Sequence, residues 1–245
     1  MKKIERLLVL GLRLACVMLG GLFLFGCIPI LNGGYNPPPN PVTEFTQRVR
    51  DAIDYWNPTT RDFAKSLINP ANEGRYNIAQ ICDIWDYCSK RVCGGHWVYV
   101  SDPVTTSGEL FNPTPASETI EAWAMTGDLR GDCDDYAVLN AALIQAIGGG
   151  TRFIVASKGD VSHAYAEVFL SDSEAHAQNL ASYISARYRI NWVNWWVDED
   201  GEIWLNLDWQ ECHPGGRFYE GQRVLVIYPY STPPASMQAP LASEW

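Results

Sequence analysis

The order of two hydrophobic patterns along the chain constrains its fold more than any other feature. Up to residue 147, apolar residues recur every three or four positions, as in 43–56, 75–92 and 137–147, which is the period of amphipathic helices. After residue 150 the chain shows alternation and short apolar runs, which are typical of β-strands. Helices followed by strands favour an α+β domain with a largely antiparallel sheet.

These patterns give a set of expected elements, bounded by Gly, Pro, Asn and Asp residues. Helices are expected at 43–56, 60–68, 75–92, 117–125 and 137–147, and a further helix at 173–188 forms an insert between strands. Strands are expected at 96–100, 151–157, 163–170, 190–197, 202–209 and 223–229. Residues 198–201 are interpreted as the turn of a hairpin.

The N-terminal 26 residues resemble a lipoprotein signal peptide. A basic start is followed by an apolar run, and Leu24 to Cys27 resembles a lipobox. The resemblance implies cleavage before Cys27, lipidation of its thiol and anchoring to a membrane on the extracytoplasmic side. The alternative is an uncleaved signal anchor, because about 18 apolar residues can cross a bilayer. Both interpretations export the remainder of the chain.

The exported part is expected to be one domain between two irregular segments. Residues 27–42 are rich in Pro, Gly and Asn and predict a stiff spacer, whereas 231–245 predict a disordered tail. The domain at 43–230 has ample apolar content, since 47% of the 245 residues are hydrophobic. The net charge is -10 without any Lys/Arg cluster in the body of the chain, which argues against nucleic acid as a partner.

The segment at 131–150 places a thiol among aspartates at the start of a predicted helix. Asp132 is a good N-cap, so Cys133 falls in the first turn, where free N–H groups and the helix dipole favour a thiolate. The Cys133 amide could also bind an oxyanion. Asp134 and Asp135 would raise the pKa of the thiol, so a positive partner such as histidine is needed. The alternative roles are a small core residue, which suits an apolar setting better, and a metal ligand, which lacks partners at ligand spacing.

A histidine and a carboxylate in the strand region could complete the site. His163 begins an alternating strand, where it could act as base and as charged partner of a thiol. Asp208 lies between Leu207 and Trp209, and a carboxylate buried there needs a partner such as His163; the alternative is a turn-capping role. Glu167, on the same strand face as His163, is expected to be solvated or to support the site from behind.

Three blocks of the sequence resemble the transglutaminase-like superfamily, and most closely its bacterial and archaeal cysteine peptidase branch. The blocks are GDCDDYA at 131–137, HAYAEV at 163–168 and LDW at 207–209, and 76–103 is similar to the helix and strand that precede the cysteine in that family. The resemblance covers about 76–228. It implies a papain-like core, with a cysteine-bearing helix packed on an antiparallel β-sheet and neither metal nor cofactor. Cys133 would be the nucleophile, His163 the base and Asp208 the orienting carboxylate.

Two points depart from or extend the family pattern. His163 and Asp208 are 45 positions apart (208 minus 163), although their strands are hairpin partners in compact members. The insert between them is a candidate lid or substrate wall, and loop-closure entropy allows it. Trp97 and Tyr99 are candidates to assist the Cys133 amide at the oxyanion, with the core as the alternative place for either, and Asp132 is a candidate supporting residue.

The other cysteines of the domain leave several pairings open. Cys82 and Cys88 lie on one predicted helix, separated by about 9 Å of rise, which is too far for a bridge. Cys93 could pair with Cys88 or with Cys212. A zinc site formed by Cys93, Cys212 and two neighbouring histidines is an alternative, but its spacing fits no strong signature.

Together these features predict an exported thiol enzyme that acts on amide or peptide bonds through a thioester. The thioester would be resolved by water, as in a peptidase or amidase, or by an amine, as in a transglutaminase. Hydrolysis is favoured because no second substrate site is evident. The alternative is a catalytically silent module that binds a cell-envelope polymer or protein. Five tryptophans at 192–209 flank the site, and any that face outward could form a groove wall for a peptide or glycan.

Overall fold

The computed structural model describes residues 40–102 and 111–232. The expected signal peptide, the lipidation of Cys27, most of the spacer and nearly all of the tail lie outside these residues. Within the two described ranges, no helix has both the length and the apolar character needed to cross a membrane.

Within 40–102 and 111–232, six α-helices form where the periodic segments predicted them, with shifted ends. They are α1 (Pro41–Ala52), α2 (Pro58–Ser66), α3 (Ile78–Cys88), α4 (Ala116–Thr126), α5 (Cys133–Ala146) and α6 (Glu174–Tyr188), and short 3-10 turns lie at Pro70–Asn72 and Arg91–Cys93. An Asn–Pro pair defines the N-terminus of α1, and another defines that of α2. The side chains of Asn40 and Asn57 accept hydrogen bonds from backbone N–H groups two residues on, and proline occupies the first helical position. Helix α1 therefore begins inside the expected spacer.

The strands of the described residues form two sheets. The larger contains β3 (Thr151–Lys158), β4 (Val161–Ser171), β5 (Trp195–Val197), β6 (Ile203–Asn206) and β7 (Gln222–Ile227), in the order β5-β6-β4-β3-β7. All its neighbouring pairs are antiparallel, so the expected α+β class and antiparallel sheet are confirmed. The smaller sheet pairs β1 (Trp97–Tyr99) in parallel with β2 (Leu129–Gly131). The expected strand at 190–197 is shorter than predicted, and β2 was not predicted because three residues carry no alternation.

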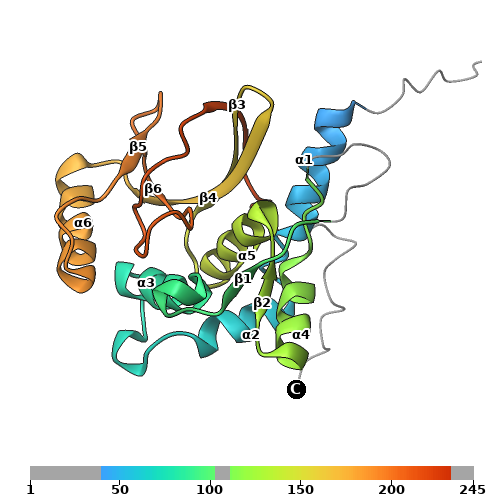
Figure 1. Cartoon of the computed structure of the whole chain (residues 1–245). Helices are drawn as coiled ribbons and strands as arrows, with labels where there is room; N and C mark the ends of the chain where they lie inside the picture. Colours follow the sequence, from blue (N-terminus) through green and yellow to red (C-terminus); the bar gives the residue numbers. More distant parts are fainter. Residues whose placement is uncertain (1–39, 103–110, 233–245) are drawn as a thin grey trace, which may run out of the picture. The chain divides into compact units, whose positions relative to one another are not determined.

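Helix α5 lies at the centre of the domain, with the larger sheet on one side and α2 and α4 on the other (Figure 1). It is buried from Asp134 to Ile144, as expected of a helix that is apolar on all sides. The small side chains of Ala164 and Ala166 on β4 belong to the same core cluster as α5. The opposite face of the sheet carries a second cluster, of Ile154, Ala156 and Tyr165 with Phe218 and Tyr219.

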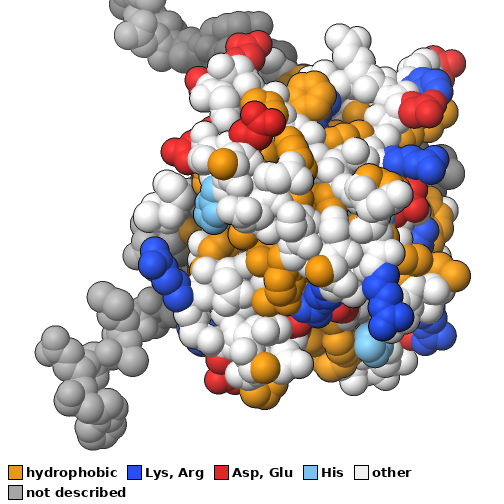
Figure 2. All heavy atoms as spheres, turned by 90° about the vertical axis from the view of Figure 1, so that its left-hand side faces the viewer, with side chains coloured by type: hydrophobic (Ala, Val, Ile, Leu, Met, Phe, Trp, Pro, Cys, Tyr) orange, Lys and Arg blue, Asp and Glu red, His pale blue; other side chains and the backbone are white. Residues whose placement is uncertain are grey.

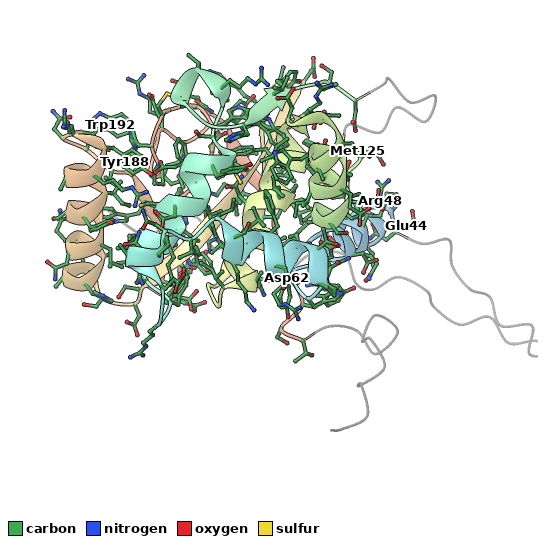
Figure 3. All side chains as sticks on the ribbon, turned by 90° about the horizontal axis from the view of Figure 1, so that it is seen from below. Glu44, Arg48, Asp62, Met125, Tyr188 and Trp192 are labelled. Carbon is green, nitrogen blue, oxygen red and sulfur yellow. A yellow bond between two sulfur atoms is a disulfide. The ribbon has the colours of Figure 1, made fainter. Side chains whose placement is uncertain are left out.

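The insert between β4 and β5 is fastened to α3. Arg187 pairs with Asp83 at 2.8 Å and with Asp86 at 2.6 Å, and the Tyr188 hydroxyl donates to Asp86 at 2.6 Å; Figure 3 shows Tyr188 on the inner side of α6. Strands β4 and β6 are nevertheless direct neighbours. The pairing expected between the His163 and Asp208 strands is therefore kept despite the insert.

One disulfide joins distant parts of the domain. Cys93 and Cys212 are bonded, with a sequence separation of 119, whereas Cys82 and Cys88 are free and buried. The structure thus selects Cys212 of the two pairings that were open for Cys93. The zinc alternative is wrong, because the two cysteines that it requires are bonded to each other.

Candidate functional site

The N-terminus of α5 is shaped by hydrogen bonds among its own aspartates. Asp132 is the N-cap and accepts from the Asp134 amide at 3.3 Å, while the Asp135 carboxylate accepts from the Asp132 amide at 3.2 Å. Gly131 has a φ of +156°, and a Cβ there would overlap the Asp135 side chain. The glycine and the aspartates therefore fix Cys133 at the first helical position, as the sequence predicted.

The Cys133 thiol is half-buried, and the backbone amide of Ala164, the residue after His163, donates to it. Burial, with smaller contributions from the charges of Asp132, Asp134 and Asp208, raises the pKa of the thiol to about 12, although the Ala164 amide lowers it. The upward effect expected of Asp134 is present, and Asp132 and Asp208, which the sequence analysis had not named for this effect, add to it. The free thiol, rather than the thiolate that the helix terminus alone would favour, is the resting form at neutral pH.

The pair expected between His163 and Asp208 is present. His163 Nε2 lies 2.9 Å from Asp208 Oδ2, and Asp208 is 1% exposed. Asp208 also accepts from the Gln210 side chain at 2.9 Å. With Nε2 directed at the carboxylate, Nδ1 is the imidazole nitrogen left for proton transfer.

Three separate elements thus bring the predicted groups to one place: the start of α5, the start of β4 and the residues after β6. His163 and Asp208 are in direct contact. Cys133 reaches the same strand one residue along, through the Ala164 amide. In the part of the chain that the structure describes, no hydrogen bond joins the thiol to the imidazole.

An aromatic cluster surrounds the imidazole, and its central residue is Trp209. The Trp209 ring lies 5.9 Å from His163, 6.3 Å from Trp97, 5.5 Å from Tyr99 and 5.2 Å from Tyr136. The sequence analysis named Trp209 as the apolar neighbour of Asp208, as part of the LDW block and as one of five tryptophans that could form a groove wall, but not as a contact of His163. The position of Trp209 directly after the predicted carboxylate was the signal that could have indicated its contact with His163.

Tyr219 closes the other side of the imidazole, with its ring 5.0 Å from that of His163. It belongs to the irregular segment between β6 and β7. Because that segment has no hydrophobic period, the sequence offered no signal for this contact.

The two oxyanion candidates differ in their surroundings. Trp97 is 2% exposed, and its indole Nε1 is buried without an acceptor among the described residues. A buried donor with no partner is costly, and the oxyanion role expected of Trp97 stays a prediction. Tyr99 is 58% exposed and lies at the edge of the site.

The prediction that Glu167 is solvated is wrong, whereas its support of the site stays a prediction. Its side chain is 0% exposed and is ion-paired with Arg152, at 2.7 Å from Nε, and with Arg223. It does lie on the same face of β4 as His163, but four residues away, about 13 Å along the strand. Its partners come from β3 and β7, which the alternation of β4 alone could not reveal.

The acidic groups next to Cys133 form the one potential metal-ligand set within the described residues. Ligand atoms of Asp132, Cys133 and Asp134 lie within 4.8 Å of one another. Asp134 is fully buried, and neither of its carboxyl oxygens accepts a hydrogen bond from the described residues. Burial, together with the neighbouring Asp132, raises the pKa of Asp134 to about 9. Asp134 is therefore protonated at neutral pH, a form poorly suited to binding a cation.

The chain was compared with protein-family models, with curated proteins and with solved structures. No family model matches it, no curated protein matches it, and no solved structure matches it.

Proposed function

We propose that this protein is an exported thiol enzyme of the transglutaminase-like type, with a papain-like core, that cleaves amide or peptide bonds. The observation that carries the proposal is the 2.9 Å pair of His163 with Asp208 beside a thiol at the N-terminus of α5. Cysteine, histidine and aspartate follow in the order, and with the flanking residues, of the resemblance described above.

In the proposed reaction, His163 Nδ1 takes the thiol proton as the Cys133 sulfur attacks the carbonyl carbon. The new C–S bond pushes the carbonyl electrons onto oxygen, where the Cys133 amide and the Trp97 indole N–H can donate to it. When the C–N bond breaks, the imidazolium gives its proton to the leaving amine. The thioester remains, and Asp208 stabilises the imidazolium throughout.

Water then completes the proposed cycle. His163 takes a proton from water, the hydroxide attacks the thioester, and the thiolate leaves and regains the proton. An amine in place of water would give acyl transfer. We favour hydrolysis because solvent alone suffices for the second step.

The high pKa of Cys133 bears on the first step. A resting thiol must lose its proton during attack, so His163 acts as a general base rather than as half of a preformed ion pair. The Cys93–Cys212 disulfide supports the exported location, because such bonds persist in oxidising compartments. Lipid anchoring and a protein, peptide or cell-wall peptide substrate remain part of the proposal.

Selective alkylation tests the proposal without a known substrate. Iodoacetamide should label Cys133 in the folded protein, while Cys82 and Cys88, both 0% exposed, serve as internal controls. His163→Ala should slow the labelling of Cys133 near pH 6 to 7. A rate equal to that of an ordinary thiol and unchanged by the substitution would favour the alternative, a silent binding module.

Incubation with envelope peptides and an added amine then separates the two second steps. Peptide cleavage supports hydrolysis, and incorporation of the amine supports acyl transfer. Cys133→Ser is the matched control, because it removes the nucleophile with a change of one atom.

A further inference from the structure

A pocket of about 440 Å³ lies on the face of the larger sheet that carries the second hydrophobic cluster. It is lined from both β5 and β7, the two edges of the sheet. Opposite edges can share one pocket only if the sheet curls, and Figure 1 shows this curl in β3 and β4. The volume falls within the range of small-molecule sites. Nothing in the proposed function uses this pocket.

The floor of the pocket is a buried ionic cluster. Arg152 is 2% exposed, and its Nη1 donates to Asp198 at 2.9 Å and to the Tyr228 hydroxyl at 3.3 Å. Glu167 pairs with both Arg152 and Arg223. Two arginines are thus balanced by two carboxylates. Such clusters add little net stability compared with apolar packing, so stability alone is a weak reason for this one.

One donor in the floor has no partner. Arg152 Nη2 is buried and lacks an acceptor among the described residues. The guanidinium carbon lies 4.1 Å from the centre of the Trp204 ring, but this stacking supplies no acceptor for the Nη2 N–H groups, which lie in the plane of the guanidinium. A ligand that accepts a hydrogen bond would remove this cost.

The walls present flat aromatic surfaces. Trp196 is 43% exposed and Tyr228 is 45% exposed. Arg223 lies 3.8 Å from the centre of the Trp196 ring and holds it in place. Figure 2, which views the side that carries α6 and β5 in Figure 1, shows hydrophobic side chains interspersed with acidic and basic ones.

The rim supplies hydrogen-bond acceptors. Glu199 and Asp200 are exposed and line the pocket. Ionised carboxylates only accept hydrogen bonds. Since the two floor arginines are already neutralised, these carboxylates leave the mouth of the pocket negative, which disfavours an anionic ligand.

A ligand that fits must therefore accept at the floor, donate at the rim and offer an apolar face to the walls. A hydroxyl group both donates and accepts, whereas an ammonium group only donates. We propose that this pocket binds a neutral polyhydroxylated ring, a sugar unit of a glycan chain. Glu167, which pairs with both arginines of the floor, lies on the same face of β4 as His163, about 13 Å away along the strand.

Binding of neutral oligosaccharides tests the inference. Cellotetraose, maltotetraose and tetra-N-acetylchitotetraose would be titrated against the full chain by calorimetry and by saturation-transfer NMR. We expect saturable binding of at least one of them. Trp196→Ala should weaken it about tenfold or more, because it removes a stacking face at the centre of a site. Tyr183→Ala, at a 39% exposed aromatic residue on α6, is the matched control and should leave binding unchanged.

A second variant and a competing ligand complete the test. Glu199→Gln with Asp200→Asn changes only exposed side chains, so the fold is kept, and it should weaken sugar binding severalfold. Cys133→Ser should bind as the parent does, which separates this site from the proposed catalysis. No saturable binding of any of the three sugars overturns the inference. So does preferential binding of a lysine-rich peptide that the rim variant abolishes, because the pocket would then recognise a cationic side chain.

Discussion

Replacing Asp208 by asparagine should change the pH dependence of Cys133 alkylation in a way that few other substitutions would. Asparagine keeps the shape of the side chain but removes the charge that lies 2.9 Å from His163 Nε2. Two unit charges about 4 Å apart interact by about 4 kcal/mol at an effective dielectric constant near 20. That energy corresponds to about a thousandfold in the population of the imidazolium–thiolate form.

The same charge has the opposite effect on the thiol itself. Asp208 is one of the groups that raise the pKa of Cys133. Its removal therefore makes direct ionisation of the thiol easier. At pH 6 to 7, where alkylation depends on proton transfer to His163, Asp208→Asn should slow the reaction by up to about a thousandfold. At the alkaline end, where the thiol ionises directly, the variant should react faster than the parent.

The assay is the rate of iodoacetamide labelling of Cys133 across pH, followed by mass spectrometry. The two profiles should cross, and Cys82 and Cys88 should stay unlabelled while the protein is folded. His163→Ala should abolish the alkylation of Cys133 near neutral pH, both in the parent protein and in the Asp208→Asn variant. Profiles that are parallel, or that coincide, would refute the idea that Asp208 acts through the imidazole.

Three further outcomes are expected. Glu167→Gln should lower the free energy of unfolding by about 3 kcal/mol, because it leaves buried Arg152 short of a counterion. The corresponding decrease in Tm is about 6 to 12 °C. The control, Glu121→Gln at an exposed position, should change the free energy of unfolding by less than about 0.5 kcal/mol. Replacing both Cys93 and Cys212, which are 119 residues apart, by serine should lower the free energy of unfolding by up to about 5 kcal/mol through the loss of loop-closure entropy. Denaturant unfolding measures this change, and an unchanged midpoint would contradict the presence of the bond. Trp97→Phe should lower turnover of a peptide substrate about a hundredfold while leaving alkylation unchanged, whereas equal loss in both assays would exclude an oxyanion role.

The parts of the site that the sequence revealed are those whose position follows from a local pattern. Cys133 could be placed because an N-cap and a glycine stop define its helix. His163 could be placed because β4 alternates, and Asp208 because a carboxylate in an apolar run needs a partner. The α+β class could be predicted from the order of helices and strands, because the hydrophobic period of a helix or of a strand is visible within a short stretch of sequence.

The parts that the sequence did not reveal depend on contacts between distant segments. Glu167 was assigned to the correct face of β4, but the arginines that bury it come from β3 and β7. Tyr219 reaches His163 from an irregular segment. The short strand β2 is specified by its pairing with β1 rather than by its own composition. Such contacts follow from the curl and order of the sheet, which no single window of sequence contains.

The bridge between Cys93 and Cys212 has a consequence for when the protein can act. It fastens the stretch just before β1 to the stretch just after Trp209, so it holds Trp97 and Trp209 together across the reactive groups. Reducing compartments keep cysteines as thiols. In the exported enzyme that we propose, a newly made chain would therefore lack this bond until it left the cell interior, and the proposed activity would be withheld from the polypeptides among which it is synthesised.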